Sequence, residues 1–321
     1  MKSSKTRGLV SSSIVLLAMS GAVIPPNYDY QAKAQTVAQE KRSKTTWEWN
    51  DDGWRRRVEI QGKAEFNDDY SDITDVSNDG SVRIEEIRGS IDRRLDVRKD
   101  ASGQLVRKYL VNGESTTLDA KGREWVAGLL LIAVRQGTID ANRRVEKILK
   151  QRGVAGMLEE ISSIEGEYGK RIYFQTLLKN ESLNRSDRSR IMLAASKQIS
   201  SDHEKANILK STADLFLSDA TLSNALFQAI ATINSDYEHR LTLSSLLKRK
   251  NLGEHVLSQM LASTAGISSD HEKANFLLEA SSAYTGDARL RSEFLKTVDT
   301  IKSDHERGRV LSAMLRNKQI G

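Results

Sequence analysis

The chain contains no cysteine and only two prolines among its 321 residues. The absence of cysteine excludes disulfides, thiolate metal sites and a lipid-anchored cysteine, so the folded state must be stabilised by packing. Both prolines are adjacent, at Pro25 and Pro26. From residue 27 onward, therefore, no proline interrupts a helix or a strand.

The sequence also lacks a large excess of charge of either sign. Its net charge is +6, and residues 1–34 carry +3 of this, from Lys2, Lys5, Arg7 and Lys33 against Asp29. The rest of the chain is close to balance, unlike the dense basic surface of a nucleic-acid binder. We expect no nucleic acid among its partners.

Long hydrophobic runs are missing too, because the longest, at 9–24, has 16 residues and is short for a membrane-spanning helix. Basic residues precede it, so residues 1–34 are predicted to be an export signal and the protein to be exported, to the periplasm. Cleavage is expected at Ala32-Lys33-Ala34, with Ser20-Gly21-Ala22 as a competing site. The alternative is an uncleaved anchor, which would be the one membrane contact. Residues 35–45 are polar and predict a flexible lead-in.

Residues 46–118 show short segments in which apolar and charged residues alternate, which predicts an antiparallel β-rich domain. One face should be buried, against the first helices or a second layer. Trp47, Trp49 and Trp54 surround Asp51-Asp52-Gly53, and we favour a hairpin with cross-strand packing over a ligand platform. The predicted strands are 54–60, 81–87, 91–97 and 104–111, with turns at 78–80, 101–103 and 112–113.

An acidic loop lies inside this region, at Asn67-Asp68-Asp69 with Asp72 and Asp75. Its carboxylates are the ligands that Ca²⁺ prefers, but the D-x-D-x-D-G spacing of a calcium loop is absent. We therefore favour a solvated loop.

The second half of the chain contains four copies of one tetrapeptide, S-D-[H/Y]-E, which start at Ser201, Ser235, Ser269 and Ser303 and so recur every 34 residues. A fixed period of this length is typical of stacked repeats. Within each copy, Ser and Glu form a capping box, in which the Ser hydroxyl accepts from the N3 amide and the Glu carboxylate accepts from the N-cap amide. Each copy should therefore start a helix.

Apolar residues recur in matching columns after each tetrapeptide, which predicts a shared core. A degenerate fifth copy occupies 164–170, residues 142–150 and 154–164 suggest one more hairpin, and an apolar helix at 120–134 could seal the start of the array. Residues 119–321 thus predict an α-solenoid of helical hairpins, and the whole chain an α+β fold. The core columns are Leu209, Leu243, Leu277 and Leu311; Leu222, Val256 and Leu290; Leu226, Met260 and Phe294; and Ile199, Ile233, Ile267 and Ile301.

Three motifs together carry a resemblance to a known group. They are Asp119-x-x-Gly122-Arg123-x-Trp125, the segment 139–152 and the tandem S-D-[H/Y]-E repeats. The chain resembles exported bacterial proteins of largely unassigned function, and similar regions are attached to sensor metallopeptidases of the β-lactam-regulator type. These motifs are structural, and the H-E-x-x-H motif of zinc proteases is absent, so the resemblance implies no catalytic residue.

All five histidines lie in the repeats, at His203, His239, His255, His271 and His305. Three of them share one column, but packed helices lie about 8–10 Å apart, too far for neighbouring members to share a zinc ion at about 2 Å. A metal-buffering protein is therefore our third hypothesis. We expect no cofactor and no metal.

Ser245-Leu246-Leu247-Lys248 matches the S-x-x-K motif, in which a Lys can assist a Ser nucleophile. The companion S-D-N and K-T-G motifs are missing, and we expect no catalytic residue. The second hypothesis is nevertheless an envelope hydrolase, or a regulatory subunit of a sensor peptidase, that uses Ser245 and Lys248.

Our first hypothesis is an exported, non-enzymatic scaffold that presents a helical-repeat surface to a protein partner in the cell envelope. Stacking explains the residues that recur in every copy, so partner contacts should lie where copies differ, on one face of each first helix. That face also includes Asn207, Asp214, Ser244, Asn275, Ser282 and Ser312. The predicted partner-binding residues are Lys210, Leu241, Lys248, Leu278, Arg309 and Arg316.

A second candidate surface is a basic helix face before the array, opposed only by Asp140 and Glu146. We favour a solubilising face or a dock for the acidic loop, and the alternative is an anionic partner or a membrane surface. The face consists of Arg143, Arg144, Lys147, Lys150 and Arg152.

Overall fold

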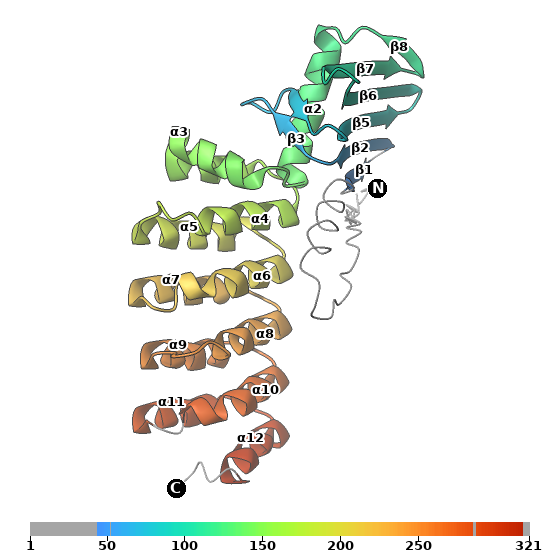
Figure 1. The fold of residues 1–321 in the computed structure, drawn as a ribbon. Coiled ribbons are helices and arrows are strands. Elements are labelled where there is room, and N and C mark those ends of the chain that lie inside the picture. Colours follow the sequence, from blue (N-terminus) through green and yellow to red (C-terminus); the bar gives the residue numbers. More distant parts are fainter. Residues whose placement is uncertain (1–43, 52, 285–286, 317–321) are drawn as a thin grey trace, which may run out of the picture. The chain divides into compact units, whose positions relative to one another are not determined.

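The computed structural model describes residues 44–51, 53–284 and 287–316 (Figure 1). The chain divides into two compact units, Met1–Ile139 and Asp140–Gly321. The first is built on antiparallel strands and the second on helices, which confirms the predicted α+β class. The predicted export signal and residues 35–43 of the predicted lead-in lie outside the described residues.

The first unit contains a six-stranded antiparallel sheet of order β1-β2-β5-β6-β7-β8 and a two-stranded sheet of β3 and β4. The predicted hairpin around Asp51-Asp52-Gly53 is confirmed, because Asp51 pairs with Trp54. Asn112 and Gly113 both have positive φ, at 51° and 85°, as a two-residue hairpin turn requires. The strands are β1 Lys44–Asp51, β2 Trp54–Gln61, β3 Ala64–Phe66, β4 Ile73–Val76, β5 Ser81–Arg88, β6 Ile91–Lys99, β7 Leu105–Val111 and β8 Glu114–Thr116.

Helix α2 (Ala120–Gln136) covers one face of the six-stranded sheet. Its apolar face, which includes Trp125 and Leu130, shares one core with Val58, Ile84 and Leu95. The structure thus divides the chain after Ile139 and groups α2 with the strands, whereas the sequence analysis placed the boundary at 118/119 and grouped this helix with the repeats. The physical reason is that the apolar stripe of α2 is already buried by the sheet.

The second unit stacks helical hairpins, with first helices on first helices and second helices on second helices (Figure 1). α3 contains two helical parts, because Gly153 interrupts it at φ 64°, which confirms the predicted hairpin. Among the described residues, no helix has the length and hydropathy to cross a membrane. The helices are α3 Ala141–Ser162, α4 Glu167–Leu178, α5 Arg185–Gln198, α6 Asp202–Thr212, η1 Ala213–Leu215, α7 Ala220–Ile230, α8 Asp236–Leu247, α9 Glu254–Ala265, α10 Asp270–Ala280, η2 Ser281–Tyr284, α11 Ala288–Val298 and α12 Asp304–Arg316.

The predicted apolar columns form the core of this stack. Leu209, Leu243 and Leu277 are fully buried, whereas Leu311 is only partly buried because α12 is the last helix of the described array. The Ile column and both columns of the second helices are buried as well. The sequence register of the repeats is therefore confirmed.

Candidate functional site

The Asp of each tetrapeptide links its own helical hairpin to the next one. Asp236 accepts hydrogen bonds from the backbone N–H groups of Ser268 and Ser269, at 3.0 and 2.8 Å. Ser269 precedes α10, so a carboxylate of one repeat binds an N–H group at the start of the next repeat's helix. Asp202 and Asp270 make the same two bonds to the repeats that follow them. The Ser303 and Lys302 amides lower the pKa of Asp270.

The Ser of each tetrapeptide is the predicted N-cap. The Ser235 hydroxyl accepts from the Glu238 amide at 3.3 Å, and the other three copies repeat this bond. The second bond of the predicted capping box is not formed, because the Ser235 amide donates to Asp202 of the preceding repeat instead. In the degenerate copy Glu167 replaces the Asp and accepts from the Ser200 and Ser201 amides. Burial opposes its ionisation, but these two bonds prevail and lower the pKa of Glu167.

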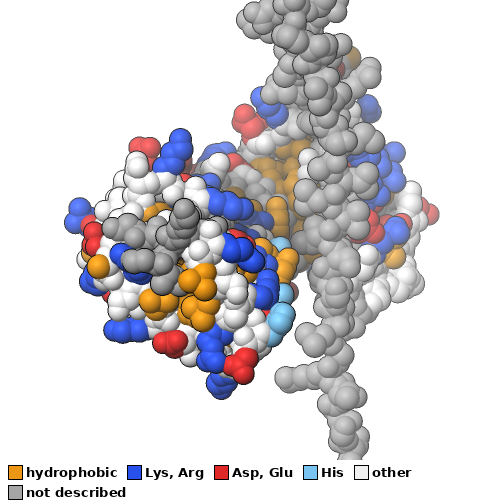
Figure 2. Space-filling model, turned by 90° about the horizontal axis from the view of Figure 1, so that it is seen from below, with side chains coloured by type: hydrophobic (Ala, Val, Ile, Leu, Met, Phe, Trp, Pro, Cys, Tyr) orange, Lys and Arg blue, Asp and Glu red, His pale blue; other side chains and the backbone are white. Residues whose placement is uncertain are grey.

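The Glu does not take part in a capping box and instead binds a His or Arg side chain of the preceding repeat. In two copies this partner is the His of the tetrapeptide: His203 Nδ1 lies 2.9 Å from Glu238 Oε1, and His271 Nδ1 lies 3.3 Å from Glu306 Oε1. In Figure 2, which views the repeats from their C-terminal end, His side chains gather at one edge beside Lys and Arg side chains. The His column therefore serves stacking.

Where Tyr replaces His, an Arg three residues later takes over the link. Arg240 Nε donates to Glu272 Oε2 at 2.7 Å, and its guanidinium lies 5.3 Å from the ring centre of Tyr237. In the two copies where His forms the link, the position of Arg240 is occupied by Ala206 or Ala274. The links thus alternate between two chemistries along the array. The α4 copy uses the Arg version, with Tyr168, Arg171 and Glu204.

A buried side chain also connects the two helices of each hairpin. Lys205 Nζ donates to the Thr232 carbonyl at 2.9 Å, just beyond the end of α7. Lys273 makes the equivalent bond to Thr300 in the α10 copy. In the α8 copy His239 takes this place, and burial lowers its pKa. Its Nε2 lies 2.8 Å from the Ser263 hydroxyl.

Each of the four positions of the tetrapeptide thus takes part in a structural contact, either within its own helix or with a neighbouring repeat. Across the described ranges, no group of three or more His, Cys, Asp or Glu side chains is arranged to hold a metal ion. Apart from the His/Tyr position, the positions that differ between copies lie outside the tetrapeptide and are candidates for contacts with a partner.

One group of these variable positions lines a groove between α8 and α10, with a volume of about 600 Å³. Leu241 forms an apolar part of the wall, and Lys248 is exposed, with no ion pair to any described residue. Ser244 is only 5% exposed, and its hydroxyl is buried without a hydrogen-bond partner in the described part of the chain. Arg240 and Glu279 lie 3.6 Å apart at the other side. The groove therefore offers a cation and an apolar surface together.

Two differences between neighbouring repeats explain why this groove is open. Between α6 and α8 the equivalent space is bridged by Arg249, which donates to Asp214 Oδ1 and to the Lys210 carbonyl, both at 2.9 Å. One repeat later, Ala283 stands at the position of Arg249 and Lys248 at the position of Asp214. The bridging side chain is thus replaced by a methyl group, and Ala283 lines the groove instead of filling it.

The structure brings together only part of the predicted partner-binding face. Leu241 and Lys248 share the groove, whereas the Lys210 carbonyl lies at the bridged interface. Leu278 is partly buried against the core, Arg309 pairs with Glu306 and Asn275, and Arg316 is exposed at the end of α12. Ser244 was predicted on the exposed face but is buried, because α8 is packed between α6 and α10.

Ser245 and Lys248 of the S-x-x-K match both line the groove. No hydrogen bond joins the Ser245 hydroxyl to Lys248 or to another base within the described residues. A Ser nucleophile needs a base within hydrogen-bond reach.

The predicted basic face before the array is not one continuous surface. Arg144 is buried, and its Nη2 donates to Glu160 Oε1 at 2.7 Å, so it joins the two helical parts of α3. Arg143 lies 4.0 Å from Asp140, and Arg152 pairs with Glu159. Lys147 is half-buried, and Lys150 is exposed. The sequence spacing predicted Arg144 on the same exposed face as the other cations, because spacing alone does not reveal that Glu160 lies opposite Arg144.

The acidic loop of the first unit is held by cations of its own unit. Asp72 pairs with Arg107 at 3.0 Å, and Asp75 pairs with Lys99 at 2.9 Å. The bond from Lys99 lowers the pKa of Asp75. Two of its carboxylates thus fasten the loop to strands β6 and β7.

The sequence analysis missed Arg240, Glu279 and Ala283 as parts of the groove. Aligning the repeats residue by residue outside the tetrapeptide would have given the signal, since Ala283 replaces a long cation there. Comparison with known proteins gives no match to this chain among family models, curated proteins or solved structures. The resemblance stated from the sequence therefore stays a prediction.

Proposed function

We propose that the protein is an exported, non-enzymatic scaffold that binds a protein partner in the cell envelope through its helical repeats. The main contact is the groove between α8 and α10. The observation that carries this proposal is that variable residues form an open groove there, while the equivalent space at the neighbouring interface is filled by Arg249.

The lining of the groove indicates what the partner presents. Lys248 suits a carboxylate, and Leu241 suits an apolar side chain. We therefore expect a polypeptide segment that has an acidic side chain next to an apolar one.

The test fills the groove with the same pair of side chains that bridges the neighbouring interface. The double variant Lys248→Asp and Ala283→Arg copies the Asp214–Arg249 pair of the preceding interface, so it should fold and keep its melting temperature. Cross-linking capture from envelope extract should then lose the partners that the wild-type protein binds. The matched control is Lys250→Gln, which makes the same net charge change at an exposed residue outside the groove lining.

If the double variant and the wild-type protein capture the same partners in the same amounts, the groove is not the binding site. The secondary basic face would then be tested next, with Lys150→Glu, because Lys150 is exposed.

The second hypothesis, a hydrolase or a sensor-peptidase subunit, rests on Ser245 and Lys248 lining the same groove. It predicts hydrolysis of β-lactam or peptidoglycan substrates that Ser245→Ala abolishes. On our proposal, the wild-type protein hydrolyses neither kind of substrate.

A further inference from the structure

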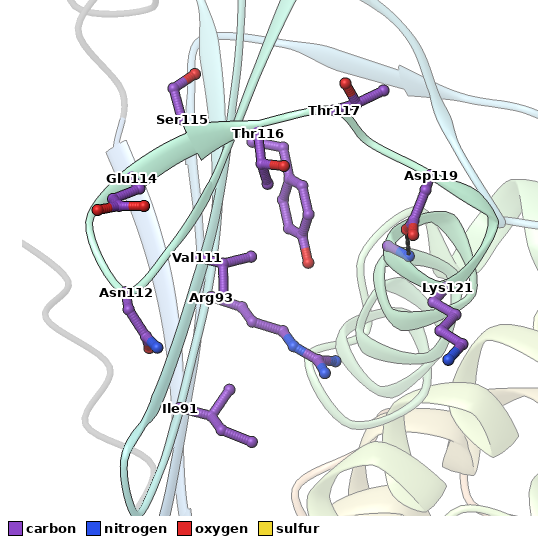
Figure 3. Close-up of a pocket in the computed structure, with 12 residues that line it drawn as sticks. Ile91, Arg93, Val111, Asn112, Glu114, Ser115, Thr116, Thr117, Asp119 and Lys121 are labelled. Atoms are coloured by element: carbon purple, nitrogen blue, oxygen red, sulfur yellow. Dashed lines mark hydrogen bonds between the residues drawn. The ribbon is translucent and has the colours of Figure 1, made fainter.

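A second pocket lies within the first unit, between the β6–β8 end of the six-stranded sheet and the first turn of α2 (Figure 3). Its volume is about 760 Å³. Strand register explains which side chains face it, because Arg93 pairs with Val111, and Tyr109 pairs with both Leu95 and Thr116. The buried Leu95 belongs to the core under α2, so these side chains point to the α2 side of the sheet.

Two cations extend into this pocket from opposite sides. Arg93 reaches from β6 toward the first turn of α2, and Lys121 extends from that turn toward the same space (Figure 3). Neither forms an ion pair with any described residue. Of the two acids in the lining, Asp119 is engaged as the N-cap of α2, where its Oδ1 accepts from the Gly122 amide at 2.8 Å, and Glu114 lies at the hairpin end. The two acids balance the two cations in number, but among the described residues neither acid forms an ion pair with Arg93 or Lys121.

Tyr109 adds an oriented donor that the protein itself does not use. The residue is only 6% exposed, and no hydrogen bond of its hydroxyl is found in the described part of the chain. Its ring lies 5.7 Å from that of Trp125, and a Cβ atom at Gly122 would lie 3.2 Å from Tyr109 Cε1, so the ring is closely packed. Burial raises the pKa of Tyr109, which keeps the O–H group as a donor.

We propose that this pocket binds a small organic anion. Its carboxylate or phosphate group accepts from Arg93, Lys121 and the Tyr109 hydroxyl. The positive end of the α2 dipole favours the same charge. The apolar part of the ligand lies against Val111 and Ile91, an Ile that is 42% exposed. This site belongs to the first unit and does not depend on the proposed role of the repeats.

The experiment is an NMR titration of the purified protein with acetate, butyrate and inorganic phosphate. At least one of them should shift the signals of β6, β7 and the first turn of α2 with a saturable dependence on concentration. Phosphate binding more tightly than acetate would identify a phosphate site, and the reverse a carboxylate site. If the apolar wall takes part, butyrate should bind more tightly than acetate, by about fourfold for each methylene that it buries.

Variants separate a built site from general attraction to a positive surface. Tyr109→Phe keeps the ring and its packing on Trp125, and it should weaken binding about tenfold or more, because it removes a hydrogen bond to a charged group. Arg93→Ala should abolish binding. Arg94→Ala is the matched control, because Arg94 is the next residue of β6, faces the other side of the sheet and pairs with Asp96.

Three results would overturn the proposal. The first is no saturable shift with any of the three anions in the wild-type protein. The second is a Tyr109→Phe variant that binds as tightly as the wild-type protein. The third is an equal loss of binding in Arg94→Ala and Arg93→Ala, which would indicate an adventitious charge effect.

Discussion

Replacing the linking carboxylates tests whether the tetrapeptide joins the repeats as the structure indicates. Asp236 accepts the Ser268 amide with Oδ1 and the Ser269 amide with Oδ2. A hydrogen bond to a charged group contributes about 1.5–3 kcal/mol. Ser268 is exposed, so water can replace its bond after mutation, whereas Ser269 is half-buried. We therefore expect Asp236→Ala to lower the free energy of unfolding by about 2–3 kcal/mol.

The comparison of Asp236→Asn with Asp270→Asn is a sharper test. An Asn side chain has one acceptor oxygen and one NH₂ group. At Asp270 both amides of the next repeat, those of Lys302 and Ser303, donate to the same oxygen, Oδ2, so an Asn could keep both bonds. It would lose only the ion pair of Oδ1 with Lys273, which is long at 4.0 Å. At Asp236 the two amides use different oxygens, so an Asn would place its NH₂ group against an N–H donor. Asp236→Asn should consequently be the more destabilising change.

Urea denaturation followed by circular dichroism measures both variants, and hydrogen exchange of the Ser269 amide reports on the link itself. Stability in stacked repeats is shared between neighbours, so the transition should shift as a whole. Faster exchange at Ser269 is expected in Asp236→Asn. Equal denaturation midpoints for Asp236→Asn and Asp270→Asn would refute the geometric argument, and an unchanged midpoint for Asp236→Ala would refute the link.

Three further predictions concern packing, a buried ion pair and pH. Leu243→Ala should cost about 2–5 kcal/mol in urea denaturation, while Leu315→Ala, at a residue 63% exposed, should cost far less. Arg144→Ala should lower the free energy of unfolding by about 3–5 kcal/mol, because it removes the cation that pairs with the buried Glu160. The double change Arg144→Met and Glu160→Leu should restore most of this lost stability. Burial lowers the pKa of His239 below its ordinary 6.5, so the unfolded state binds the proton first, and stability should fall as the pH drops below about 6.5. Thermal melts of His239→Gln should lack this component, and an unchanged pH dependence would contradict the assignment.

Most of the longer strands were predicted because apolar and charged residues alternate in part of them. The alternation covers 82–85 in β5 and 95–98 in β6, and both strands begin at the predicted residue. β1 has eight residues but was predicted only as one arm of the hairpin around Asp51-Asp52-Gly53. β3, β4 and β8 have three or four residues each, too few to establish a period of two. The partner of α2 could not be read from the sequence either, because an apolar helix face does not specify whether a sheet or another helix buries it.

The repeat register was predictable because identical neighbours require identical contacts. The Leu and Ile columns repeat every 34 residues and are buried. The role of Asp236 was not predictable, since its partners are backbone amides that share no sequence signal. Lys248 could be singled out from the sequence because its position varies between copies. The groove that Lys248 lines could not be predicted, because it depends on packing between two helices.

The groove differs from the neighbouring interface through positions that lie outside the tetrapeptide. Arg249 and Asp214 close the space between α6 and α8, and Ala283 and Lys248 take their places between α8 and α10. Meanwhile the link of this second interface, from Arg240 to Glu272, stays intact at 2.7 Å. Arg240 takes part in both, since it links two repeats and lines the groove, whereas Lys248 and Ala283 line the groove and belong to no tetrapeptide link. Because the Lys248→Asp and Ala283→Arg variant leaves Arg240 and Glu272 unchanged, its stack should keep this link and the variant should fold normally.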